Sequence, residues 1–191
     1  MSTGAIIAII VVVVLVVAAA VFLLMPQMRS QRLRRRFGPE YDHAVSNNGD
    51  RRAAEKELTD RERRHSEYDL HPIPPENREK YRAEWNRVQE RFVDEPVESV
   101  AQADRLVNVV VADLGYPSEG YDRQLADLSV RHAHTVEHYR TAHDTHVRQD
   151  ASTDDLRTAL ISYRKVFEDL LDHGVDGRHT KHNKTEAVQR G

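Results

Sequence analysis

The sequence predicts an all-α protein: an N-terminal transmembrane helix, basic juxtamembrane helices and then a bundle of approximately four helices. Three observations support this prediction. An apolar run without a single charge occupies residues 5–25. Apolar residues in the rest of the chain recur at intervals of three and four, which is the period of a helix. No segment shows the alternation of apolar and polar residues that is typical of a half-buried strand.

The run from Ala5 to Met25 contains no polar residue, no glycine and no proline. As a helix it would be about 31 Å long, which matches the roughly 30 Å hydrocarbon core of a bilayer. Helices of soluble proteins rarely stay apolar on every side over this length, because they need a face for water. We therefore predict a single transmembrane helix over residues 5–25, preceded by a short tail of residues 1–4.

A cleaved signal peptide is the alternative interpretation of this run. Such a peptide has a positively charged start, a shorter apolar core and a cleavage site of small residues. The alanines at 18–20 resemble a cleavage site, but residues 21–25 continue the apolar run and residues 1–4 carry no basic side chain. These features favour an uncleaved anchor.

Arginines are concentrated directly behind the apolar run, whereas none precedes it. Basic side chains beside a spanning helix are retained on the cytoplasmic side of the cell membrane. This asymmetry predicts a single-pass protein with its N-terminus outside and its C-terminal domain in the cytoplasm. Anionic lipid headgroups are the predicted partners of the membrane-interface residues Arg29, Arg32, Arg34, Arg35 and Arg36. A more specific lipid or protein site at these side chains is the alternative.

Residues 26–66 are predicted to form basic juxtamembrane and charged spacer helices. Pro39 is suited to the first turn of a helix, and the glycine of the Asn47–Gly49 stretch interrupts that helix. Asp50 is the predicted N-cap of the next helix, which is polar nearly all round and is expected to pack only lightly. The prolines of residues 67–76 end it, and this segment is the predicted linker to the compact domain.

Four amphipathic helices joined by short turns are predicted over residues 77–173, which is the pattern of an up-and-down bundle. Prolines and glycines separate the first three, and the third is expected to run without a break from Tyr121 to Arg148. Ser152 and Asp155 resemble a capping box at the start of the fourth. Residues 174–191 have little to bury and are predicted to be disordered. The predicted core of the first helix consists of Tyr81, Trp85, Val88 and Phe92.

The composition excludes several classes of function. Charged residues make up 31% of the chain but nearly balance, giving a formal net charge of −3. This balance argues against the broad basic surface of a nucleic-acid-binding protein. The sequence contains no glycine-rich phosphate loop, no nucleophile elbow and no cysteine. We therefore expect neither a catalytic site nor a cofactor.

Histidine is the one residue type whose pattern suggests site chemistry. His134 and His138 are four residues apart, a spacing that suits two metal ligands on a helix. Both, however, are expected to point away from the apolar face, whereas His132 and His143 share that face. We expect the latter two to be partly buried, each with one ring nitrogen bonded to a neighbour, and we predict no metal site. A histidine-rich domain that senses a metal or another ligand is the alternative.

Several short motifs add a family resemblance. The segment 35–42 reads RRFGPEYD, residues 49–55 read GDRRAAE, and residues 81–85 read YRAEW. Together with the segments 103–107 and 138–143, they resemble a family of uncharacterised, single-pass actinobacterial membrane proteins, some of which are labelled as secreted. The resemblance spans most of residues 33–171. It implies a helical domain behind a membrane anchor, and it implies no activity and no functional residues.

Taken together, the sequence predicts a membrane-anchored helical module that binds or organises a protein partner and catalyses no reaction. This prediction rests on the clear anchor and helical bundle and on the absence of a recognisable catalytic motif from the sequence. The sequence does not identify the partner.

Overall fold

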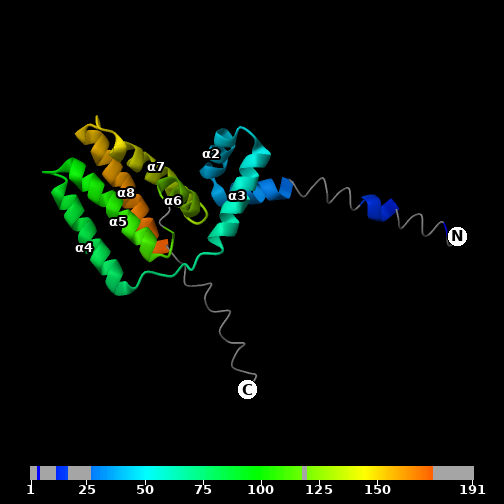
Figure 1. The fold of residues 1–191 in the computed structure, drawn as a ribbon, viewed down its shortest axis with the longest axis horizontal. Helices are drawn as coiled ribbons and strands as arrows, with labels where there is room; N and C mark the ends of the chain where they lie inside the picture. Colours follow the sequence, from blue (N-terminus) through cyan, green and yellow to red (C-terminus); the bar gives the residue numbers. More distant parts are fainter. Residues whose placement is uncertain (1–3, 5–11, 17–26, 118–119, 174–191) are drawn as a thin grey trace, which may run out of the picture. The chain divides into compact units, whose positions relative to one another are not determined.

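The computed structural model describes residue 4 and the ranges 12–16, 27–117 and 120–173. All regular secondary structure within these ranges is helical, which confirms the all-α prediction. None of the described helices is both long enough and apolar enough to span a bilayer. Most of the predicted transmembrane run and all of the predicted C-terminal tail lie outside the described residues. The chain divides into two compact units, residues 1–60 and 61–191 (Figure 1).

The first unit contains a helical segment over residues 27–37, helix α2 (Pro39–Asn48) and most of α3 (Arg51–His65). Pro39 is the first residue of α2. Proline suits this position because the first N–H groups of a helix have no partner within it, and proline has no N–H. Gly49 ends it in the left-handed conformation with φ 66°. The predicted N-cap of α3 is confirmed, because Asp50 Oδ2 accepts a hydrogen bond of 3.1 Å from the N–H of Ala53.

The expectation that α3 packs only lightly is wrong. Ala54 and Leu58 are completely buried, and Glu55 between them is only 8% exposed. The first two of these helical segments also bury apolar side chains, including Phe37 and Tyr41. A helix with few apolar residues therefore has a well-packed face, because those few fall on one side of it.

The second unit is a helical bundle. Helix α8 packs against α5 and α7, α4 packs against α5, and α6 packs against α7 (Figure 1). The completely buried core includes Val100, Val107, Tyr163 and Leu170. Trp85 is also buried and stacks on Phe167 with ring centroids 4.9 Å apart. The helices are α4 (Pro75–Arg91), α5 (Pro96–Asp113), α6 (Tyr121–Leu128), α7 (Ala133–Val147) and α8 (Thr153–His173).

The predicted capping box at the start of α8 is confirmed. Ser152 Oγ accepts a hydrogen bond of 3.2 Å from the N–H of Asp155, and Asp155 Oδ2 accepts one of 3.0 Å from the N–H of Ser152. Each side chain thus satisfies a backbone donor that the first turn of the helix leaves without a partner. The same contacts with Ser152 hold the pKa of the Asp155 carboxyl below its usual value.

The prediction of one continuous helix from Tyr121 to Arg148 is wrong. The chain leaves the helix after Leu128 and starts again at Ala133, so that α6 and α7 are separate elements. At the break, the hydroxyl of Ser129 donates a hydrogen bond of 2.6 Å to the carbonyl of Ala126. Serine hydroxyls compete in this way with the backbone ladder of a helix. His132 lies at the break, directly before the first residue of α7.

The proline-rich segment 67–76 lies within the second unit, and its Ile73 is part of the core. The N–H of His71 donates a hydrogen bond of 3.1 Å to the carbonyl of Leu114 at the end of α5. Gly115 has φ 93°, and a Cβ atom there would lie 2.3 Å from the carbonyl oxygen of Asp69. Only glycine allows this close approach of the two backbones.

Candidate functional site

The helical segment 27–37 has two different faces. Ser30, Leu33 and Phe37, at intervals of three and four residues, are buried. The opposite face is exposed and lines an open groove of about 460 Å³. The residues along this groove are Met28, Gln31, Arg32, Arg35 and Arg36. The helical period therefore places the buried side chains and the groove on opposite sides of the segment.

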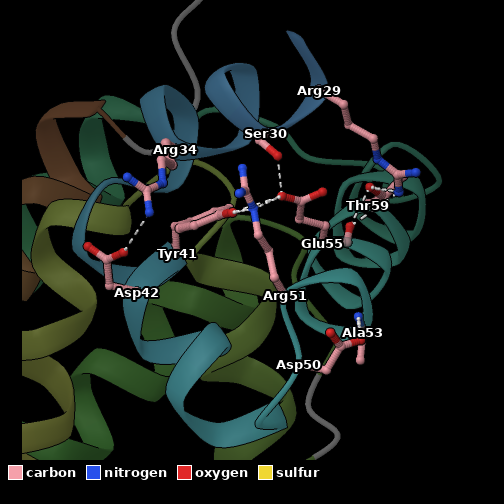
Figure 2. Close-up of polar contacts among 10 residues, drawn as sticks. All are labelled: Arg29, Ser30, Arg34, Tyr41, Asp42, Asp50, Arg51, Ala53, Glu55 and Thr59. Atoms are coloured by element: carbon pink, nitrogen blue, oxygen red, sulfur yellow. Dashed lines mark hydrogen bonds and ion pairs between the residues drawn. The ribbon is translucent and has the colours of Figure 1, made fainter. Parts of the chain in front are cut away.

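On the buried side, the carboxylate of Glu55 gathers three donors (Figure 2). Its Oε1 atom accepts hydrogen bonds from the hydroxyl of Ser30, from the Tyr41 hydroxyl at 2.8 Å and from Arg51 Nε at 3.0 Å. Burial alone raises the pKa of Glu55, but the bonds from Ser30, Tyr41 and Arg51 outweigh it, so the pKa lies below its usual value of 4.5. Glu55 thus remains ionised and ties the segment 27–37 to α2 and α3.

Two of the five predicted interface arginines turn to partners within the first unit (Figure 2). One guanidinium nitrogen of Arg29 donates to Thr59 Oγ1 at 2.7 Å and to the carbonyl of Glu55 at 3.3 Å. The guanidinium of Arg34 lies 3.8 Å from Asp42 and 4.9 Å from the ring centroid of Tyr41. The other three, Arg32, Arg35 and Arg36, line the groove, and all five side chains are exposed.

Four histidines of the second unit take part in two polar clusters, each built around a carboxylate. In the first, Asp169 of α8 is the centre: His132 Nδ1 lies 2.5 Å from its Oδ2, to which the Thr135 hydroxyl also donates at 2.9 Å. His134 and His173 each place a ring nitrogen near Oδ1, at 3.2 and 3.3 Å. Burial raises the pKa of Asp169, but the hydrogen bond and charge of His132 and the bond from Thr135 lower it to about 2.

The second cluster surrounds Asp104 of α5. Its carboxylate accepts a hydrogen bond of 2.8 Å from the Tyr163 hydroxyl and one of 3.0 Å from the side-chain amide of Asn108. His143 Nδ1 lies 3.5 Å from the same carboxylate, and the His143 ring stacks on Tyr121 with centroids 3.6 Å apart. These contacts join α5, α6, α7 and α8.

The predicted packing of two histidines is confirmed, since His132 and His143 each bond one ring nitrogen to a carboxylate inside the bundle. His134 is exposed over 71% of its side chain, as the sequence predicts. Burial, followed by the charge of Lys165, lowers the pKa of His138. Among the described residues, no group of three or more histidine, aspartate or glutamate side chains is arranged to hold a metal ion.

Sequence reasoning missed the carboxylates at the centre of these clusters, Glu55, Asp104 and Asp169. Each is bonded to side chains 25 or more residues away in the sequence. Pattern analysis classes such carboxylates with the solvated charges of a polar face. The sequence contains one indication that two of them are buried. Asp104 is adjacent to Ala103 and Asp169 is adjacent to Leu170, and both apolar residues belong to the apolar face of their helix.

Comparison with profiles of known protein families gives no match. Comparisons with curated proteins and with solved structures likewise give no significant match. The resemblance to single-pass actinobacterial membrane proteins therefore stays a prediction from the sequence motifs.

Proposed function

We propose that this chain is a non-catalytic, membrane-anchored interaction module that presents a helical bundle to a protein partner. The proposal of a membrane anchor is supported by the helical stretch 12–16 within the apolar run. All of its side chains are more than half exposed, from 54% at Val13 to 63% at Leu15. Because five consecutive residues cover every side of a helix, no side of this stretch is polar. A hydrocarbon environment would satisfy such a surface, and water would not.

The arginines that follow this run favour a cytoplasmic position for residues 26–191. Confinement to the membrane raises the effective concentration of the bundle near any partner that is also bound there. The module therefore does not need a large or tight interface to find its partner. The clusters around Asp104 and Asp169 support a structural role for the polar interior, because their contacts link the helices of the bundle to one another.

The proposed contact region consists of the turn between α4 and α5 and the first turn of α5. Among the described residues of the second unit, Val93 and Val97 are the most exposed large apolar side chains, at 85% and 65%. Exposed valines are poorly solvated, and burying them against a partner would contribute to binding. Neither side chain belongs to the core of the bundle.

Site-specific photocrosslinking in intact membranes tests this proposal. A photoreactive amino acid at Val93 or Val97 is expected to give a discrete crosslinked product, either with one protein or with a second copy of the chain. The same amino acid at Glu90, an exposed position one turn earlier on α4, provides the matched control. Absence of a discrete product from both valine positions, or equal products from all three positions, would contradict a specific interaction at this turn.

A further inference from the structure

We propose that a pocket between α5, α6 and α7 binds a small, neutral, flat molecule that carries a carboxamide or a similar pair of neighbouring hydrogen-bond donor and acceptor. This inference goes beyond the proposed interaction module and does not depend on the membrane anchor. The pocket has a volume of about 280 Å³ and lies within the second unit. The lining residues that support the proposal are Asn108, Tyr121, Gln124, Tyr139 and His143.

Gln124 of α6 is the residue that indicates a ligand. It lines the pocket and is only 8% exposed. Its backbone N–H donates a hydrogen bond of 3.0 Å to the carbonyl of Gly120, but its side-chain amide bonds to no other residue in the described part of the chain. A buried amide without a partner is destabilising, and most buried polar groups have one. A bound molecule that offers both an acceptor and a donor would satisfy this amide.

Aromatic side chains give the pocket flat walls. The rings of Tyr121 and His143 stack with centroids 3.6 Å apart, and the ring of Tyr139 makes a T-shaped contact with Tyr121 at 5.5 Å. The Tyr139 hydroxyl donates a hydrogen bond of 3.1 Å to Asn108 Oδ1, which ties α7 to α5. These contacts within the protein form the walls without help from a ligand. Preformed aromatic surfaces beside a few polar groups are typical of small-molecule sites.

The charges around the pocket favour a neutral ligand. No lysine, arginine, aspartate or glutamate is among the described residues that line it, so neither an anion nor a cation finds a direct partner there. Two lining residues, Asn108 and His143, contact the carboxylate of Asp104. This negative charge disfavours an anion in particular. The volume is near the lower end of the range for ligand sites, which suits a single ring with one amide group.

The test is a fluorine NMR titration of the full chain in detergent micelles with para-fluorobenzamide as the probe and empty micelles as the blank. The wild-type chain should bind this probe saturably. The benzoate of the same shape has no N–H and carries a negative charge, so it should bind at least about tenfold more weakly. The variant Gln124→Met removes the amide at nearly constant size, and its affinity for para-fluorobenzamide should fall at least about tenfold.

The thermal midpoint of the same variant separates binding from folding. Because the Gln124 amide has no partner in the described part of the chain, Gln124→Met should leave the midpoint unchanged or raise it. The matched control is Gln89→Met, which alters an exposed glutamine of α4 and should keep the wild-type affinity. A lower midpoint for Gln124→Met would show that the amide serves the fold and would overturn the proposal. Lack of saturable binding to the wild-type chain, or an equal loss of affinity in both variants, would overturn it as well.

Discussion

Replacing Val12, Val14 and Val16 together by aspartate is expected to release the chain from the membrane. Fifteen of the 21 residues from Ala5 to Met25 are leucine, isoleucine, valine or phenylalanine. At about 0.4 kcal/mol each, they favour insertion by roughly 6 kcal/mol. Each aspartate near the centre costs about 3 kcal/mol, or about 9 kcal/mol for three, so the balance turns against insertion. Aspartate is chosen because it adds no positive charge that would alter orientation.

Extraction of membranes with alkaline carbonate measures this effect. The wild-type chain should remain in the membrane pellet, whereas the triple aspartate variant should appear in the supernatant. Replacement of the same three valines by leucine preserves the apolar character and should leave the chain in the pellet. Release of the wild-type chain, or retention of the aspartate variant, would show that residues 5–25 are not the anchor.

Replacing Asp169 by alanine is expected to reduce the free energy of unfolding of the second unit by about 4 kcal/mol at neutral pH. The change removes the partner of the buried His132 and of the Thr135 hydroxyl. Breaking a buried pair on one side is costly because the remaining polar group keeps its desolvation without its bond. Denaturant unfolding of the full chain in detergent, followed by the fluorescence of Trp85, measures the difference.

The neighbouring residue provides the control for this prediction. Glu168 forms a surface ion pair of 2.7 Å with Arg164, and both side chains are about half exposed. Its replacement by alanine should cost less than about 1 kcal/mol. Similar losses for Glu168→Ala and Asp169→Ala would show that the buried cluster has no special role in stability.

The contribution of Asp169 to the stability of the second unit should depend on pH. The pKa of Asp169 is lowered from 3.8 to about 2 in the folded chain, so its contribution to stability is present above pH 3.8 and is lost as the pH falls toward 2. A shift of this size corresponds to about 2 kcal/mol. The stability difference between wild type and Asp169→Ala should therefore narrow by about that amount on acidification. A difference that is constant with pH would contradict the ionised state of Asp169.

The parts of the fold that were predictable depend on residues near one another in the sequence. Pro96 opens a helix because its fixed φ suits the first turn, and Ser152 with Asp155 caps one because they are three residues apart. The break between α6 and α7 was not predictable from apolar spacing. Leu128, His132 and Val136 keep the helical period across it, and that period suggests continuity.

The contacts of the arginines show the same limit for the candidate site. The basic cluster and its proximity to the apolar run are evident from the sequence. Arg29 bonds to Thr59 and Arg34 pairs with Asp42 at the surface, and the orientation of the segment depends on Glu55. These partners come together only after the segment 27–37, α2 and α3 have packed. Composition counts all five arginines alike, whereas their environments differ.

Protease treatment of wall-stripped cells that express the chain with a C-terminal tag tests the central claim most directly. If the helical units are on the cytoplasmic side, as proposed, the tagged domain should resist protease in intact cells and be digested after detergent is added. Digestion without detergent would contradict the orientation inferred from the arginines. It would place the bundle outside the membrane and direct the search for its partner to the cell envelope.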